Sequence, residues 1–347
     1  MKVLITGGTG YIGSHVALAM SAARHPVVLL DNLRHSHPQV ATRLQHLSGQ
    51  PMPLEVGDVR DTALLSRILL EHEIDAVVHC AGIKGLQAAA RRPLDAYAHN
   101  LQGTLSLLQA LSVYDRPMLL FTSSAEVYGE PFYRLQDERH PTQPTTALGR
   151  SLLLAETLIA DTVASLSTDW RVAILRCFHP AGAHESGLVG GSHGLPDTAE
   201  GLLPHLARVA AGAVPCLPLY RRHEETPDGT ALRDFTHVVD IAQGYLAALD
   251  YLVGHPGRHL FNLGRGQPVS VMAALKAFER ASGQPVRWTP CQQDPSEVTC
   301  SAANALRAKN QLGWQAWRSL ADMCDSSWNH LLTAMETGAL PGHRVAR

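Results

Sequence analysis

The sequence predicts an α/β fold in which a doubly wound parallel sheet is followed by a smaller lobe of mixed helices and strands. Short apolar runs alternate with segments of helical period through the first half of the 347 residues, as in parallel strands joined by crossover helices. Several runs are apolar without alternation, which is typical of strands covered on both faces. A glycine cluster stands between the first predicted strand and the first predicted helix.

The first half is expected to contain strands at residues 2–6, 26–31, 54–57, 74–80, 117–123 and 171–177. Helices are expected between them at 11–23, 62–72, 95–112 and 146–167. After about Pro180 glycine, proline and histidine become frequent through residues 181–198, which predicts a loop-rich stretch. Further helices are expected at 201–211, 238–253, 270–282 and 320–336.

The composition argues against several kinds of partner. The formal net charge is −2, so nothing favours a polyanion such as nucleic acid. No apolar run is long enough to span a bilayer and no leader is recognised, so a cytoplasmic location is expected. The six cysteines form no C-x-x-C pair, which favours free thiols in a reducing compartment. The 19 histidines are scattered, and no metal site is predicted.

Residues 4–13 read Leu-Ile-Thr-Gly-Gly-Thr-Gly-Tyr-Ile-Gly and predict a phosphate-binding turn. Gly7, Gly10 and Gly13 permit a tight turn and close approach to a pyrophosphate, and the following helix offers unpaired N–H groups. Asp31 ends the second strand about 20 residues further on, where a carboxylate accepts hydrogen bonds from ribose hydroxyls and repels a 2′-phosphate. The pattern predicts a Rossmann-type domain that binds NAD, and Arg34 keeps NADP as a lesser alternative.

Longer motifs carry a resemblance to a known family. They read Gly7-Gly8-Thr9-Gly10-Tyr11-Ile12-Gly13-Ser14-His15, Leu30-Asp31-Asn32-Leu33, Gly57-Asp58-Val59-Arg60, His79-Cys80-Ala81-Gly82-Ile83-Lys84, Asn100-Leu101-Gln102-Gly103-Thr104, Ser123-Ser124-Ala125-Glu126-Val127-Tyr128-Gly129, Asp228-Gly229-Thr230-Ala231-Leu232-Arg233-Asp234-Phe235-Thr236-His237-Val238 and Asn262-Leu263-Gly264. On these residues the chain resembles the UDP-glucose 4-epimerases, which are extended short-chain dehydrogenase/reductases, from residue 1 to about residue 328. The NAD-binding domain is expected at 1–180, with 237–262 returning to it, and 181–347 mainly as a substrate-binding lobe.

The resemblance implies a cofactor site and a substrate site. The residues implied to hold NAD, beside the three motif glycines, are Tyr11, Ile12, Asp31, Asn32, Ser36, Asp58, Val59, Cys80, Ala81, Lys84 and Phe178. His99 stands where the family has an asparagine that touches the cofactor. Ser124 would bond the 4-hydroxyl of a UDP-sugar, Arg233 would pair with its diphosphate, and His179 replaces an asparagine of the substrate pocket.

The family's proton-transfer residues are absent from the aligned segment. The family pattern Tyr-Gly-Lys-Ser-Lys aligns with residues 148–152, so the tyrosine becomes Leu148 and the catalytic lysine becomes Leu152. A leucine cannot transfer a proton or donate a hydrogen bond. Arg150 matches the noncatalytic lysine and lies roughly 200° around the helix from Leu152. Near Gln292, the family's second diphosphate arginine is also missing.

Two functions remain open from the sequence. One is a UDP-glucose 4-epimerase-like protein that holds NAD without ordinary catalysis; the other is an active UDP-sugar 4-epimerase with an unusual base, for which His179 is a candidate. A lesser alternative is a nucleotide-sugar dehydratase or decarboxylase, which Glu126 suggests and Ala125 argues against. The resemblance also implies a homodimer formed through the helices 95–112 and 148–167, where Leu153, Leu154, Leu158 and Ile159 are interpreted as interfacial.

Overall fold

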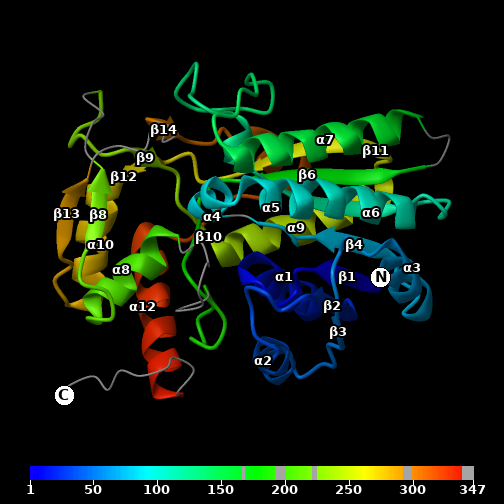
Figure 1. The fold of residues 1–347 in the computed structure, drawn as a ribbon, viewed down its shortest axis with the longest axis horizontal. Helices are drawn as coiled ribbons and strands as arrows, with labels where there is room; N and C mark the ends of the chain where they lie inside the picture. The colour runs from blue at the N-terminus through cyan, green and yellow to red at the C-terminus, as the bar shows by residue number, and fades with distance from the viewer. Residues whose placement is uncertain (84, 166–168, 192–200, 221–224, 292–297, 338–347) are drawn as a thin grey trace.

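The computed structural model describes residues 1–83, 85–165, 169–191, 201–220, 225–291 and 298–337. Its larger part is a parallel sheet with helices on both faces, and a smaller group of helices and short strands lies beside one end of that sheet (Figure 1). The predicted fold class is confirmed. Among the described residues, no helix is both long and apolar enough to cross a bilayer.

The main sheet has seven strands in the order β11-β6-β5-β4-β1-β2-β3, and every pairing is parallel. Its strands are β1 (Val3–Thr6), β2 (Val27–Asp31), β3 (Leu54–Val56), β4 (Ala76–His79), β5 (Met118–Ser124), β6 (Arg171–Cys177) and β11 (Gly257–Leu263). The chain moves outward from β1 in one direction and from β4 in the other, so the topological switch point lies between β1 and β4. In a doubly wound sheet that is where ligands bind.

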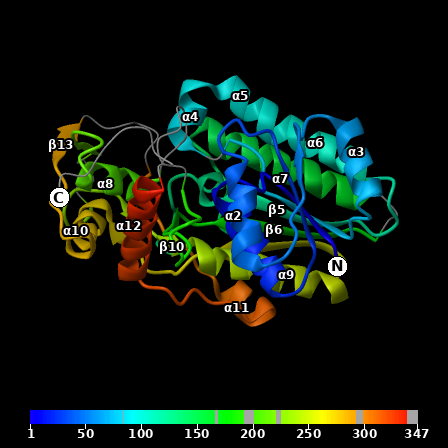
Figure 2. The same ribbon diagram turned by 90° about the horizontal axis from the view of Figure 1, so that it is seen from below.

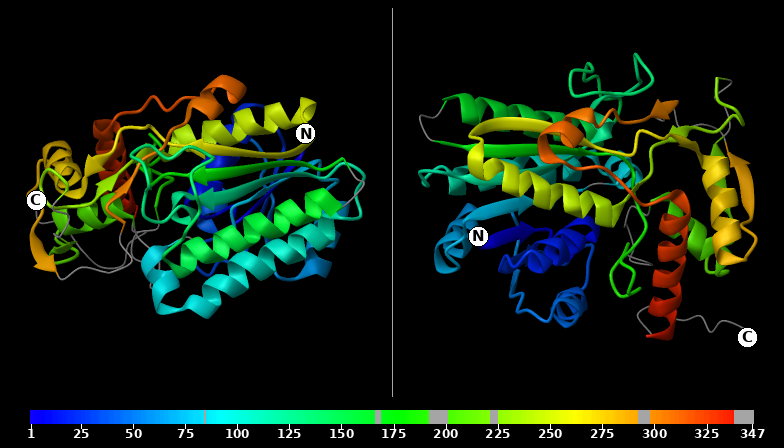
Figure 3. Two further views of the ribbon diagram at one scale, coloured as in Figure 1. Left: turned by 90° about the horizontal axis from the view of Figure 1, so that it is seen from above. Right: turned by 180° about the vertical axis from the view of Figure 1, so that it is seen from behind.

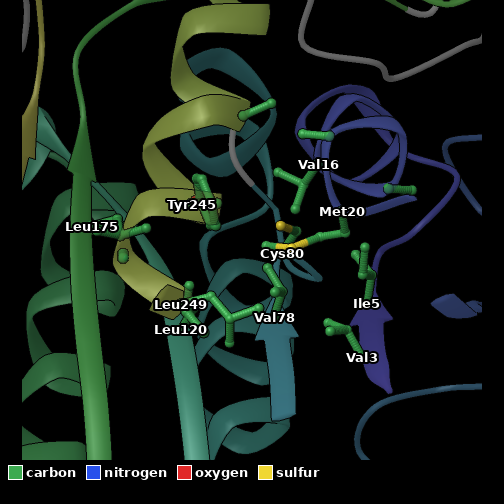
Figure 4. Close-up of a cluster of buried hydrophobic side chains, with 14 of the residues drawn as sticks. Val3, Ile5, Val16, Met20, Val78, Cys80, Leu120, Leu175, Tyr245 and Leu249 are labelled. Atoms are coloured by element: carbon green, nitrogen blue, oxygen red, sulfur yellow. The ribbon is translucent and has the colours of Figure 1, made fainter. Parts of the chain in front are cut away.

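Two apolar layers cover the sheet because successive strand residues point to opposite faces. Val3 and Ile5 of β1 pack with α1 (Tyr11–Ala22), α2 (Gln39–Ser48) and α9 (Val238–Gly254), as the close-up in Figure 4 shows for part of this layer. Leu4 faces the other layer, formed with α3 (Thr62–Glu71), α6 (Gly103–Leu111) and α7 (Ala147–Ser165). Burial on both faces explains why the strand sequences lack alternation.

One predicted helix is built differently in the structure. The expected helix 95–112 consists of α5 (Pro93–Tyr97), a π-helical turn η1 (Ala98–Gln102) and α6. The π-helical turn places His99 against the cavity described below. The short helix α4 (Leu86–Arg91) was not predicted from the sequence, and α2 was also missed, because only Ala41 and Leu44 of its ten residues are buried.

The smaller lobe packs three helices, α8 (Leu202–Ala210), α10 (Val271–Ser282) and α12 (Leu320–Glu336), around a separate apolar cluster (Figures 2 and 3). Its short strands join segments that are far apart in the chain. The pairs are β8 (Leu217–Tyr220) with β13 (Trp288–Cys291), β7 (Pro180–Ala181) with β10 (Thr236–His237), and β9 (Leu232–Arg233) with both β12 (Val269–Ser270) and β14 (Cys300–Ser301). The helix α11 (Leu306–Leu312) packs back against α9 and β11.

Candidate functional site

A cavity of about 340 Å³ lies over the carboxyl ends of the parallel strands, at the switch point. Strands β1, β2, β4, β5 and β6 or the turns after them all contribute to its walls, and the smaller lobe supplies one side. The lining residues are Gly7, Gly10, Tyr11, Ile12, Gly13, Leu30, Asp31, Asn32, Arg34, His35, Ser36, Gly57, Val59, Cys80, Ala81, Gly82, Ile83, Gly85, Ala88, His99, Thr122, Ser123, Ser124, Cys177, Pro180, Gly191, Gly201 and Pro204.

The glycine turn after β1 fits a bound pyrophosphate. Gly7 has φ +66°, and a Cβ there would lie 2.8 Å from the backbone nitrogen of Ala81. A Cβ at Gly13 would lie 2.2 Å from the carbonyl oxygen of Gly7. Gly10 caps α1 without a side chain, so the first-turn N–H groups of α1 face the cavity unobstructed. The turn therefore presents bare backbone to an anion at the switch point.

Asp31 stands at the end of β2 with its carboxylate held by the protein. Oδ1 accepts hydrogen bonds from the Leu33 N–H at 2.9 Å and the Ser36 hydroxyl at 3.1 Å, and Oδ2 accepts from the Thr9 N–H at 3.1 Å. Oδ2 retains a lone pair for a further donor, whereas both lone pairs of Oδ1 are used within the protein. The carboxylate is thus fixed beside the glycine turn, as recognition of a ribose hydroxyl requires.

Most predicted cofactor residues line the cavity, and two of the described ones, Asp58 and Phe178, do not. The three motif glycines, Tyr11, Ile12, Asp31, Asn32, Ser36, Val59, Cys80, Ala81 and His99 border it. Asp58 lies behind the wall and binds Arg60, which holds the pKa of the Asp58 carboxyl well below its usual range. Phe178 is fully buried, with its ring 6.1 Å from that of Tyr128. Lys84 and Gln292 lie outside the described residues.

Sequence reasoning missed several lining residues. Thr122 and Ser123 end β5 and Cys177 ends β6, and their position at carboxyl ends of parallel strands was a usable signal. Gly191, Gly201 and Pro204 reach the cavity from the smaller lobe. No local pattern marks those three, because their place depends on how the lobe packs.

The half of the cavity over β5 and β6 is lined by hydroxyls and a thiol: Thr122, Ser123, Ser124 and Cys177. The Ser124 hydroxyl accepts the Glu126 N–H at 3.2 Å. Leu148 and Leu152, on α7, are only 2% and 0% exposed, and both belong to the apolar layer with Ala125 and Val127.

Other side chains of α7 lie either on its exposed surface or in the same apolar layer as Leu148. Arg150 is exposed and donates to the Thr145 carbonyl oxygen at 2.9 Å. Leu154 is 46% exposed, but Ile159 is fully buried in the same layer as Leu148, so its interpretation as interfacial is wrong. Helical periodicity alone did not separate the exposed face of α7, which carries Leu154, from the buried face, which carries Ile159.

The two predicted substrate residues of the smaller lobe lie near each other but do not line the cavity. His179 has φ +30°, and burial together with the charge of Arg233 lowers its pKa to about 3. Arg233 donates to the carbonyl oxygens of Leu232 at 3.0 Å and Val298 at 2.8 Å. In the part of the chain that the structure describes, no group of three His, Cys, Asp or Glu side chains could hold a metal ion.

Two buried histidines, His15 and His237, lie between the glycine turn and the smaller lobe. His15 donates from Nδ1 to the Tyr11 carbonyl oxygen at 2.7 Å, while the Tyr11 hydroxyl donates to the Gly182 carbonyl oxygen at 2.6 Å. A Cβ on Gly182 would lie 2.7 Å from Nε2 of His237. Burial lowers the pKa of His15 to about 3 and that of His237 to about 4.

Lowering the pH from 7 to 5 is expected to reduce the free energy of unfolding by about 2 kcal/mol for each of these two histidines. The unfolded chain binds each proton near pH 6.5, whereas the folded protein binds it only near pH 3 or 4. This contribution to stability is therefore complete above pH 6.5 and is lost as the pH falls toward 4. Urea unfolding at both pH values measures it. His15→Gln should reduce this loss of free energy between pH 7 and pH 5 by about 2 kcal/mol. His46→Gln, at an exposed position, is the control. An equal loss between the two pH values in both variants would contradict the role given to His15.

Sequence comparison with known proteins matches the chain to a family of NAD-dependent proteins. Residues 3–264 match the model of the NAD dependent epimerase/dehydratase family. The chain is 41% identical to a UDP-glucose 4-epimerase of Yersinia pestis, covering 95% of this chain and 97% of the relative, and 38% identical to that of Neisseria meningitidis serogroup C, covering 94% and 96%.

Solved structures agree as well. A UDP-glucose 4-epimerase of Stenotrophomonas maltophila with bound NAD and formylated UDP-arabinopyranose superposes with a TM-score of 0.91 at 35% identity, over 97% of this chain and 99% of that one. The enzyme of Bifidobacterium longum in complex with NAD+ and UDP gives 0.90 at 36% identity, over 96% and 98%. The chain belongs to the NAD dependent epimerase/dehydratase family, in its UDP-glucose 4-epimerase-like branch of the extended short-chain dehydrogenase/reductases.

Proposed function

We propose that the chain is a UDP-glucose 4-epimerase-like protein that binds NAD in the cavity and lacks ordinary epimerase catalysis. One observation carries the second half of the proposal: the segment that should supply a tyrosine and a lysine supplies Leu148 and Leu152, and both are packed in an apolar layer. The bare glycine turn and the fixed Asp31 carboxylate support the first half.

The missing residues would do chemistry that no leucine can do. Bound NAD supplies a hydride acceptor for the 4-carbon of a sugar. Removal of the 4-hydroxyl proton needs a nearby base, and a phenol near pH 7 needs positive charge beside it to lower its pKa from about 10. Ser124 could donate or accept a hydrogen bond to that hydroxyl, but a neutral serine is no base at neutral pH.

Four ionisable residues in or near the cavity are poorly suited to replace the base. The phenol of Tyr11 is bonded to the Gly182 carbonyl oxygen, and burial holds its pKa well above the usual range. Asp31 ends β2, which β1 and β4 separate from β5, and Nε2 of His99 faces the Arg34 guanidinium at 3.4 Å. A pKa of about 3 makes His179 a weak base at neutral pH, because efficient general bases titrate near the working pH.

The relatives suggest a second ligand. We propose a UDP-sugar as the second ligand, since the similar structures were solved with UDP or a UDP-sugar derivative, with Arg233 and His179 in the smaller lobe as its contacts.

We also propose a homodimer. Leu94, Leu105 and Leu154 on α5, α6 and α7 are 82%, 41% and 46% exposed, and they offer apolar surface on the helices named for that contact.

An active epimerase is the second candidate, because similar proteins at 38–41% identity are named UDP-glucose 4-epimerases. Conversion of UDP-galactose to UDP-glucose by the purified protein separates the two. We expect a turnover rate at least about a hundredfold below that of the Yersinia pestis relative assayed alongside, since a positioned acid–base group contributes about 10²–10⁴-fold. Release of NAD on denaturation is the control for a loaded site. An ordinary rate would establish the active candidate.

A further inference from the structure

The cavity wall next to Asp31 carries a guanidinium group whose partners lie on α5 and η1. Arg34 is the one arginine or lysine among the described lining residues. Its backbone is fixed, because its N–H donates to Asn32 Oδ1 at 3.1 Å and the preceding Leu33, at φ +57°, donates to Asp31 Oδ1 at 2.9 Å. An arginine near the ribose-binding carboxylate is the usual means of accepting a 2′-phosphate.

The Arg34 side chain is held by Asp95 and His99. Its Nη2 donates to Asp95 Oδ2 of α5 at 3.0 Å, and Nη1 lies 3.4 Å from His99 Nε2. His99 Nδ1 faces the Asp95 carbonyl oxygen at 2.8 Å and therefore donates, which leaves Nε2 as an acceptor for Arg34. The Asp95 carboxylate also lies 3.6 Å from Arg92 Nε. The charge of Arg34 is thus already paired with the Asp95 carboxylate.

The other arginine near the adenosine side is paired in the same way. Arg60 donates to both carboxylate oxygens of Asp58 at 2.8 Å, in a bidentate arrangement. A 2′-phosphate entering beside Asp31 would therefore meet the negative charge of that carboxylate and two guanidinium groups that already pair with Asp95 and Asp58.

We infer that Asp95 is a specificity-determining residue for the dinucleotide: by holding Arg34 against α5 it denies the 2′-phosphate of NADP a cation, and the pocket selects NAD. The inference rests on the proposed NAD site and names a residue outside the motif that discriminates the two cofactors. Asp95 and Arg34 are about one third exposed, so their pair contributes little to stability and can be changed without unfolding the protein.

Asp95→Asn tests the inference, because the amide keeps the size of the side chain and removes its charge. Kd values of NAD+ and NADP+ are measured by calorimetry on the full chain after removal of any bound nucleotide. We expect the ratio of the NADP+ Kd to the NAD+ Kd to fall at least tenfold. The gain should shrink at high salt, because a freed, partly exposed guanidinium is screened.

Two further variants make the outcome decisive. Arg34→Gln combined with Asp95→Asn should lose the gain in relative NADP+ affinity, since the guanidinium provides it. Asp161→Asn, which changes an exposed residue of α7, controls for net charge. An unchanged ratio in Asp95→Asn, or a gain retained without Arg34, overturns the inference while NAD binding by the unmodified protein stands. An unmodified protein that binds neither dinucleotide overturns the proposed NAD site and this inference with it.

Discussion

Restoring the tyrosine and lysine together, Leu148→Tyr with Leu152→Lys, is expected to raise the conversion of UDP-galactose to UDP-glucose by at least about a hundredfold over the unmodified protein. The two positions lie four residues apart on α7, so their side chains share one helix face. The phenol supplies the base, and the ammonium beside it lowers the phenol's pKa. Coupled measurement of UDP-glucose formation on NAD-loaded protein follows the change.

The controls separate catalysis from packing. Both positions are buried, so a lysine there loses hydration and the double variant should unfold more easily than the parent. Leu148→Phe with Leu152→Met changes the same positions without adding a proton-transfer group and should stay inert. Leu148→Tyr alone should recover less than the pair, because nothing lowers its pKa. If the double variant binds NAD yet matches the Phe/Met control, the defect lies in the UDP-sugar pocket instead.

Arg176→Met is expected to lower the free energy of unfolding by about 3–5 kcal/mol. Arg176 on β6 and Glu156 on α7 form a bidentate ion pair with N–O distances of 2.6 and 3.0 Å, and their side chains are 5% and 6% exposed. Removing the guanidinium leaves a buried carboxylate that still accepts a hydrogen bond from the Ser123 hydroxyl at 2.5 Å. Denaturant unfolding at pH 7 measures the loss.

Two comparisons show whether burial is the cause. Arg67→Met removes exposed ion pairs with Glu71 and Glu55, and it should lower the free energy of unfolding far less than Arg176→Met. Glu156→Leu with Arg176→Met removes both buried charges and should cost clearly less than Arg176→Met alone, since no charge is left unpaired. Similar losses for Arg67→Met and Arg176→Met would refute a buried-charge effect. Glu156 also accepts a hydrogen bond from Ser123, which lines the cavity, so loss of the Glu156–Arg176 pair should weaken NAD binding.

The framework of the fold was readable from the sequence because its signals are local. Strands buried on both faces must be apolar throughout, and the turn after β1 needs glycine where a Cβ would strike Ala81 or Gly7. These requirements act over a few residues, so pattern and element order predicted the parallel sheet, the glycine turn and the carboxylate at its second strand.

The missed elements lack such local signals. The helix α2 buries only two of its ten residues, so its apolar stripe is too thin to recognise. The two-residue strands β7, β9, β10, β12 and β14 exist because distant segments pair, for example residues 232–233 with 300–301. Pairing over such separations depends on how the smaller lobe packs, which no short window of sequence records.

The sequence by itself determined the parallel sheet, the bare phosphate-binding turn, and the identity of residues 148 and 152 as leucines, because each is a property of a residue type at a fixed place in a local pattern. Only the tertiary structure decided which charges meet. Arg34 and Asp95 are 61 residues apart, and Glu156 lies 20 from Arg176 and 33 from Ser123. Electrostatic interaction depends on distance in space and on burial, so these contacts arise only when the sheet brings its strands and helices together.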